Sequence, residues 1–423
     1  MKEHLKRVIK FVLPNWAYKI FLYCYGKAQF GFWLLFAPSI NRLKARRIGK
    51  KDCVTVLFLP ANLAMWKYDY LFSLMQSHPR FKPLILPSLP LTVTGEERER
   101  TRAEMLDYFA KKGFEVIGDS VVKTLDPDIV FVTQPYGKWA DYGSFTFPRA
   151  LACYSEYSYP TSCNRTISNT GFRNRCWRIF DVTEEHKKDA AGLMSNHGRN
   201  IVVPGYLNAD YFLDPERKFS FPWKEAVPEK KKIIYAPHWT INPNSILKYA
   251  TFLQNGELML DLAKKYADKT QWVFKPHPWL YRELRKVWGE DKTKAYYDAW
   301  ANLPNATCKL GDYIDLFMTS DAMIHDSGSF RCEYFYAKKP VMHLIIDDPT
   351  KTDGEVAKIA LKAHYLGHNA EEIEAFIVDV VLGGNDPKAR ERQDFYNKYL
   401  LPPNGKTVAQ NIIDEIARDL GWR

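Results

Sequence analysis

Small polar residues with a glycine follow a short apolar run near the middle of the second half, and this pattern is able to bind a phosphate. The segment Ile324–Met342 reads IHDSGSFRCEYFYAKKPVM. We expect a buried strand over 321–325, a tight turn over 326–329 and a helix from about 330 to 337. Free backbone amides and the positive end of the helix dipole would meet at that turn, which favours an anion there.

Within this turn, Ser327, Gly328 and Ser329 are the predicted phosphate ligands, with Asp326 beside them. Hydroxyls and amides supply donors, and glycine permits close approach of the ligand. The alternative is an ordinary helix cap, for which Asp and Ser are common. Glu333 follows Ser329 by one helical turn, so its carboxylate is a candidate partner for ribose hydroxyls or, equally, a solvated helix residue.

Histidine ends three predicted strands: His238 in YAPHW, His277 in KPHPW and His325 in AMIHD. The carboxyl ends of parallel strands share one edge of a sheet, where ligands bind, so we expect one pocket. His277 is fixed between two prolines and is a candidate phosphate donor or proton carrier; His238 is a weaker candidate of the same kind. No metal is expected, because no helical histidine pair or HExxH pattern is present.

Two segments in the first half combine aromatic and polar residues: Gln134–Gly143 and Cys153–Pro160. They are candidates for an acceptor site that takes a polyol or sugar chain, or they form rigid packed loops. Asp141 and Glu156 are the carboxylates there that could deprotonate a hydroxyl.

The positive charge of the chain is confined to its beginning. The formal net charge is +11, and residues 1–51 hold twelve Lys or Arg against one acidic residue, Glu3. A nucleic-acid-binding domain would spread basic residues over its folded body, so we expect no nucleic-acid partner. Aromatic and basic residues together favour a leader that lies on anionic lipid; a helix packed on the body is the alternative.

The leader does not have the composition of a membrane span or a secretory signal. Its longest uncharged stretch, residues 28–41, is shorter than the roughly 20 apolar residues that cross a bilayer, and no small-residue cleavage pattern follows. Seven cysteines without a C-x-x-C pair indicate a reduced setting. We therefore expect a cytoplasmic protein that associates peripherally with an anionic membrane surface.

Strands alternate with helices from residue 53 onward, which predicts an α/β fold with parallel sheets. The pattern lapses over 207–230, where Pro, Lys and Glu gather, and then restarts. The predicted units are a leader (1–51), a Rossmann-like acceptor domain (52–215), a Rossmann-like nucleotide-donor domain (230–385) and closing C-terminal helices (388–423). Two such domains facing a cleft match the GT-B arrangement of nucleotide-sugar transferases.

The order of three motifs resembles the CDP-glycerol glycerophosphotransferase family of teichoic-acid and capsule polymerases. These are YAPHW, KPHPW and GDYIDLFMTSDAMIHDSGSFRCEYFYAKKPV, which together span about 231–345. The resemblance implies a GT-B fold, action at the inner membrane face and no cofactor. It also implies that His277 contacts the donor, Asp326 and Ser329 the nucleotide diphosphate, and Glu333 the ribose.

Two departures from the family pattern affect this interpretation. Gly328-Ser329 stands where the family often has Ser-Ser, and the W-H-G-T segment, whose histidine is thought to activate the acceptor, is not found; QPYGKW stands in the nearest comparable position. The expected activity is transfer of a polyol-phosphate from a CDP-activated donor to a hydroxyl of a cell-envelope polymer or lipid-linked acceptor, with release of CMP. The alternatives are a GT-B glycosyltransferase that uses a nucleotide sugar for capsule or lipopolysaccharide synthesis, and a membrane-bound scaffold without catalysis.

Overall fold

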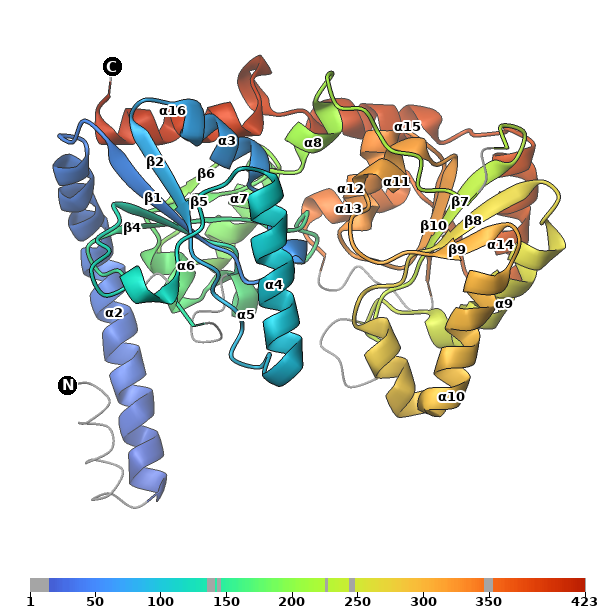
Figure 1. Cartoon of the computed structure of the whole chain (residues 1–423), viewed down its shortest axis with the longest axis horizontal. Helices are drawn as coiled ribbons and strands as arrows, with labels where there is room; N and C mark the ends of the chain where they lie inside the picture. The colour runs from blue at the N-terminus through green and yellow to red at the C-terminus, as the bar shows by residue number, and fades with distance from the viewer. Residues whose placement is uncertain are drawn as a thin grey trace.

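Two parallel sheets, one in each half of the chain, form the body of the protein (Figure 1). The computed structural model describes residues 15–134, 141–142, 146–224, 227–242, 248–345 and 353–422. The predicted acceptor segment Gln134–Gly143 therefore lies largely outside the described residues, as do residues 1–14 of the leader.

The first sheet has six parallel strands in the order β2-β1-β3-β4-β5-β6. Its strands are β1 (Val54–Leu59), β2 (Phe81–Ile85), β3 (Ile129–Val132), β4 (Leu151–Ser155), β5 (Arg178–Phe180) and β6 (Ile201–Val202). They are apolar and buried almost throughout, because helices cover both faces of a parallel sheet. All their carboxyl ends consequently share one edge.

Helices of the first half connect these strands. They are α2 (Asn15–Ile48), η1 (Leu63–Met65), α3 (Asp69–Ser77), α4 (Gly95–Lys111), η2 (Asp119–Val121), α5 (Arg165–Ser168), α6 (Gly171–Arg175), α7 (Glu184–Leu193) and α8 (Ala209–Leu213). Helix α7 begins at an N-cap, Thr183, whose hydroxyl accepts from the amide of His186, and it carries acidic residues in its first turn.

The second sheet also has six parallel strands, in the order β12-β11-β10-β7-β8-β9. Its strands are β7 (Lys231–Ala236), β8 (Thr270–Phe274), β9 (Ala306–Cys308), β10 (Ala322–His325), β11 (Val341–Leu344) and β12 (Tyr365–Gly367). The chain runs outward from β7 through β8 and β9, then returns to the other side of β7 with β10. The strand order therefore reverses between β7 and β10, which is where open α/β sheets bind ligands.

Helices of the second half flank this sheet and then lead back to the first. They are α9 (Phe252–Lys265), α10 (Leu280–Asn302), α11 (Ile314–Thr319), α12 (Phe330–Glu333), η3 (Tyr334–Ala337), α13 (Glu355–Lys362), α14 (Ala370–Ala375), η5 (Phe376–Leu382), α15 (Ala389–Phe395), η6 (Tyr396–Leu400), η7 (Pro403–Gly405) and α16 (Val408–Leu420).

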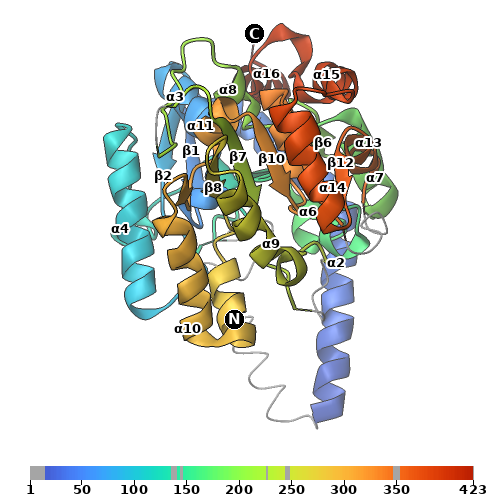
Figure 2. The ribbon, with the colours of Figure 1, turned by 90° about the vertical axis from the view of Figure 1, so that its right-hand side faces the viewer.

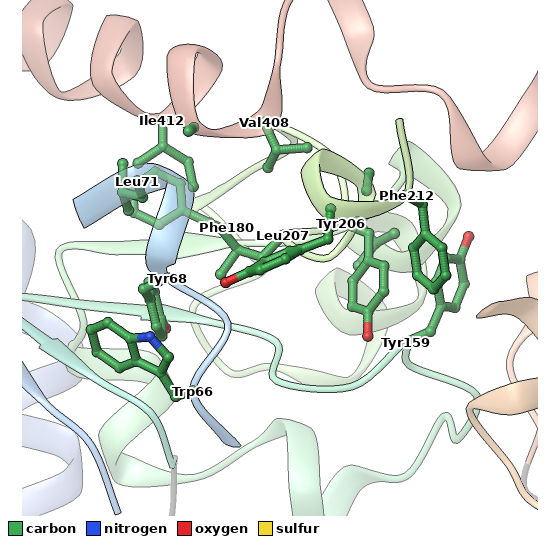
Figure 3. Packing of buried hydrophobic residues seen from close by; sticks show 14 of the residues in the cluster. Trp66, Tyr68, Leu71, Tyr159, Phe180, Tyr206, Leu207, Phe212, Val408 and Ile412 are labelled. Atoms are coloured by element: carbon green, nitrogen blue, oxygen red, sulfur yellow. The ribbon is translucent and has the colours of Figure 1, made fainter. Parts of the chain in front are cut away.

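Helix α16 packs on the first sheet's side of the molecule, although it belongs to the end of the chain (Figure 1). Its apolar face joins a core with α3 and the segment around Tyr206 (Figure 3). The carboxylate of Asp210 accepts hydrogen bonds from the amides of Val408 and Ala409, at 2.7 and 2.8 Å, and so fixes the start of the helix. One core thus includes residues from both halves.

Helix α2 runs along the first domain, and its N-terminal part extends beyond the body (Figures 1 and 2). The apolar side chains of Phe32, Leu35 and Phe36 are 49%, 72% and 49% exposed. Across the described residues, no helix combines the length and the apolar character that spanning a membrane requires.

The predicted α/β architecture of two Rossmann-like domains with a helical leader is confirmed, with local differences. The segment 114–118 has the composition of a strand but forms only a single bridge between Val116 and Ile85. Strands β4, β9 and β12 have no clear strand pattern in the sequence. Strands β9 and β12 have three residues each, too few for a periodic pattern, while β4 contains polar residues that its neighbours bury.

Candidate active site

Three loops at the reversal of the second sheet bring the predicted site residues together. His238 follows β7, His277 follows β8 and Asp326 follows β10, and these strands are adjacent. The ring centroids of His238 and His277 lie 5.2 Å apart. The amide of His238 donates to Oδ1 of Asp326 at 2.5 Å, so the three strand ends form one continuous surface.

Asp326 joins these loops from within the protein. It has no exposed surface, and its Oδ2 accepts from both the amide and the hydroxyl of Thr251, at 2.6 and 3.0 Å. Burial raises the pKa of Asp326 to about 7, while the donors from Thr251 and His238 act in the opposite direction. Because both oxygens are used within the protein, the position fits a residue that holds the loops in place for a ligand.

The ring of His277 presents a proton on Nε2. Its Nδ1 accepts from the amide of Trp279 at 3.1 Å, which places the proton of the neutral ring on the other nitrogen. Burial and then the charge of Lys275 lower the pKa of His277 to about 4, so the ring is neutral near pH 7. A neutral Nε2–H donates a hydrogen bond to an anionic oxygen but does not accept a proton there.

His238 is arranged in the same way. Its Nδ1 lies 3.0 Å from the hydroxyl oxygen of Thr240, which already accepts from the amides of Tyr249 and Ala250. The Thr240 hydroxyl therefore donates to Nδ1, and Nε2 of His238 carries the proton. Burial lowers the pKa of His238 to about 3. The two rings are thus a pair of neutral donors.

The turn after β10 offers further donors. The amide of Ser327 donates to Nδ1 of His325 at 3.1 Å. Within the described part of the chain, the amides of Gly328 and Ser329 and the hydroxyls of Ser327 and Ser329 make no hydrogen bond. Gly328 is buried, and a Cβ there would lie 3.0 Å from the Thr161 hydroxyl of the first domain. The first domain therefore closes over one side of the turn.

The helix that follows the turn is shorter than expected. The segment 330–337 divides into the four-residue α12 and the 3₁₀ segment η3. Its aligned peptide dipoles are correspondingly few. An anion at this turn would therefore be bound mainly by the local amides and hydroxyls, and less by a helix dipole.

His325 and Glu333 lie in the interior. His325 has no exposed surface and belongs to a cluster with His343 and His364, with ring centroids 4.9 and 5.5 Å from its own. Glu333 is 1% exposed and accepts a hydrogen bond from the hydroxyl of Tyr313. Contact of either residue with a ligand stays a prediction; in this structure both support the turn and its helix from behind.

The first-domain carboxylates lie apart from the histidines. Oε1 of Glu156 is paired with Arg173 at 2.8 Å, and its Oε2 accepts from the Tyr154 hydroxyl. Asp141 is paired with Arg98 of α4. No contact of either carboxylate with His238 or His277 is present among the described residues, so their roles as bases stay predictions.

Several residues at the site did not stand out in the sequence. Thr251 and Tyr249 come from the segment before α9, which has no motif of its own. Arg331 forms a fully buried bidentate pair with Asp353, at 2.5 and 3.0 Å, and Asp353 bridges to Ser162 of the first domain. Arg331 lies two residues after Ser329, and this position in the sequence could have identified it as a residue of the site. Among the residues described, no cluster of His, Cys, Asp or Glu is arranged to bind a metal.

Comparison with known proteins gives a family match and a set of similar folds. A model of the family described as CDP-glycerol:poly(glycerophosphate) glycerophosphotransferase matches residues 176–418. A search of curated proteins finds no match.

Solved structures share the architecture at low identity. A UDP complex of MnaA from S. aureus is 14% identical, with a TM-score of 0.56, over 88% of this chain and 98% of that one. UDP-GlcNAc 2-epimerase from Neisseria meningitidis bound to UDP-GlcNAc is 17% identical, with a TM-score of 0.56, over 86% and 99%. The wall teichoic acid polymerase TagF is 16% identical, with a TM-score of 0.54, over 91% and 93%. These likenesses show a shared GT-B-type fold.

Proposed function

Because the chain belongs to the CDP-glycerol:poly(glycerophosphate) glycerophosphotransferase family, and so is a transferase of the teichoic-acid type, we propose that its donor is a CDP-polyol and its leaving group CMP. The acceptor is a hydroxyl of a cell-envelope polymer or of a lipid-linked chain. The observation that carries the proposal is the group of neutral donors at the reversal between β7 and β10: two histidine Nε2–H groups beside a turn with unused amides.

In the proposed reaction, the acceptor hydroxyl oxygen attacks the phosphorus that carries the polyol. A new P–O bond forms there, the P–O bond to CMP breaks, and the hydroxyl proton passes to a base. His277, His238 and the turn around Gly328 donate hydrogen bonds to the diphosphate oxygens, whose charge grows as CMP leaves. Asp326, His325 and Glu333 position these groups. Asp141 and Glu156 remain the candidates for the base.

The proposal is tested by the nucleotide that is released. Purified protein is incubated with CDP-glycerol, CDP-ribitol and common nucleotide sugars, each with a glycerol-phosphate oligomer as acceptor, and the products are separated chromatographically. We expect CMP and an acceptor extended by one polyol-phosphate. Release of a nucleoside diphosphate would identify a glycosyltransferase, and tight binding without turnover would identify a scaffold.

Replacing His277 with alanine is expected to weaken donor binding about tenfold, because it removes one hydrogen bond to a charged oxygen. Titration of the variant with CDP-glycerol by calorimetry measures the change. Since the pKa of His277 is about 4, protonation of this ring should not change donor affinity between pH 6 and 8, so the ratio of wild-type to His277→Ala affinity should stay constant over that range. His368, an exposed histidine paired with Glu372, provides the matched control: His368→Ala should bind the donor as the wild type does.

We further propose that α2 holds the enzyme peripherally on the cytoplasmic face of the inner membrane. Two features of the helix support this: the exposed apolar group of Phe32, Leu35 and Phe36, and the cations that follow it. A small surface pocket between α2 and the first domain is lined by Lys44 and Arg175 among other residues. Burial, then the charge of Arg175, lowers the pKa of Lys44 to about 8. Apolar and cationic groups together suit an anionic lipid surface.

Serine at all three of Phe32, Leu35 and Phe36 is expected to lower binding to phosphatidylglycerol vesicles at least about tenfold, because apolar area no longer enters the lipid. Vesicle sedimentation measures the bound fraction, and deletion of residues 1–50 should abolish it. Leu310→Ser alters an equally exposed leucine elsewhere, at 61%, and should bind as the wild type does. Unchanged binding of the triple variant would contradict membrane association through α2.

A further inference from the structure

Lys67 lies where the first domain faces the second. It follows η1, in the loop between β1 and α3, and its neighbours Trp66 and Tyr68 are 4% and 1% exposed (Figure 3). The Trp66 indole donates to Asp69 at 2.6 Å. The two buried aromatic residues fix the loop in the first-domain core, and the side chain of Lys67 reaches Tyr313 of the second domain.

Lys275 approaches the same tyrosine from the second domain. Its ammonium nitrogen is 5.8 Å from the centroid of the Tyr313 ring, and that of Lys67 is 5.3 Å from it. Lys275 is 6% exposed and donates to the carbonyl of Gly311 at 3.0 Å. Lys275 lies two residues before His277 and lowers the pKa of that ring, so the lysines adjoin the donor surface described above.

The two ammonium groups have little opposing charge. Within the described residues, neither has a carboxylate at ion-pair distance. Burial lowers the pKa of both, that of Lys275 to about 8, with a further contribution to Lys275 from Lys67 itself.

Three carboxylates lie in the wider surroundings and raise the pKa of Lys67: Glu333, Asp312 and Asp69. Asp69 is paired with Lys112 at 3.1 Å. Asp312 is 69% exposed and also raises the pKa of Lys275, and Glu333 accepts a hydrogen bond from Tyr313. These carboxylates act from a distance, so neither ammonium group has a direct anionic partner among the described residues, and burying a charge without a partner is costly.

We propose that Lys67 and Lys275 form a phosphate-binding site around Tyr313, to which each domain contributes one cation. The ligand is a phosphate or diphosphate group, and its charge takes the place of the missing carboxylate. Because the site needs both domains, binding of the anion favours the arrangement in which they face each other. Its source, which rests on the proposed function, is the diphosphate of the donor or a phosphate of the acceptor chain.

Inorganic pyrophosphate is the first probe, because its binding needs no turnover. Calorimetric titration should give affinities at least about tenfold weaker for Lys67→Met and Lys275→Met than for the wild type, and Lys67→Arg should restore most of the loss. Lys232→Met is the matched control: Lys232 is paired with Asp321 at 3.5 Å at the amino end of β7, so its loss should change nothing. Melting temperatures of all variants report whether each one folds.

The second arm of the experiment separates the two sources. If the Met variants lose affinity for CDP-glycerol and keep the wild-type KM for a glycerol-phosphate oligomer, the lysines bind the donor diphosphate. If they keep the donor affinity and show a higher KM for the oligomer, the lysines bind a phosphate of the acceptor. Folded Met variants that bind pyrophosphate as the wild type does would overturn the site, even if the enzyme turns over CDP-glycerol. Conversely, lysine-dependent pyrophosphate binding without turnover of any CDP-polyol would keep the site and reject the proposed reaction.

Discussion

Asp326→Asn is expected to lower the rate of transfer at least about 100-fold, although Asp326 itself has no exposed surface. The carboxylate accepts on both oxygens, from His238 on one and from Thr251 on the other. An asparagine has one oxygen and one NH2 group, so in either orientation a donor faces a donor. The loops after β7 and β10 then separate, and the histidine pair and the turn lose their alignment.

The same substitution should lower the free energy of unfolding by about 1–3 kcal/mol, because a buried amide is left without an acceptor. Thr251→Val is the control, since it removes only the hydroxyl donor and keeps the amide that bonds Asp326; a loss of about fivefold or less is expected. Donor affinity and rate are measured with the melting temperature of each variant. An Asp326→Asn protein with wild-type donor affinity would show that the loops keep their places without the carboxylate.

Acidification from pH 7 to pH 5.5 is expected to destabilise the folded protein by several kcal/mol. Burial lowers the pKa of five histidines: His238, His277, His325, His343 and His364. In the unfolded chain each binds a proton near pH 6.5, whereas in the folded protein each stays neutral. The unfolded state thus takes up more protons, and stability is lost as the pH falls below about 6.5, by about 1.4 kcal/mol per pH unit for each histidine.

Three buried carboxyls oppose this loss. Burial raises the pKa of Asp326 to about 7, that of Asp210 to about 6 and that of Asp181 above its usual value, so the folded state takes up protons at these groups first. Asp326 and Asp210 offset about two of the five histidine protons and Asp181 offsets part of another, so the slope near pH 5.5 is at most roughly 4 kcal/mol per pH unit. Urea unfolding at a series of pH values measures this slope.

His343→Leu tests the assignment to buried histidines. Nδ1 of His343 has no hydrogen-bond partner within the described chain, so leucine removes a titrating group without breaking a bond. The slope of stability against pH should fall by about 1.4 kcal/mol per unit. A level stability curve for the wild type between pH 7 and 5.5 would contradict the argument.

The sequence predicted the site best where strands and motifs coincide. β7, β8 and β10 are short, mostly apolar runs, and His238, His277 and Asp326 follow them within three residues, so their positions and their common edge followed from the pattern. The family resemblance, drawn from the same motifs, is confirmed by the match over 176–418.

The bonding roles at the site were not predictable. Thr251 lies 75 residues before Asp326, and only folding reveals that it occupies one carboxylate oxygen. The approach of Lys67 and Lys275 to one tyrosine could not be predicted from the sequence, because it depends on how the two domains meet. Three-residue strands such as β9 and β12 carry too little periodicity to be recognised.

Because α16 returns to the first domain, the chain connects the two domains twice, once between β6 and β7 and once just before α16. A lobe tethered at two points swings readily about the line through both and resists twisting about any other. We therefore expect any opening of the molecule to be a hinge rotation about the axis through the two connections. Truncating the chain before Pro402 would remove one of the two connections and expose the apolar surface that Ile412 and Ile416 cover.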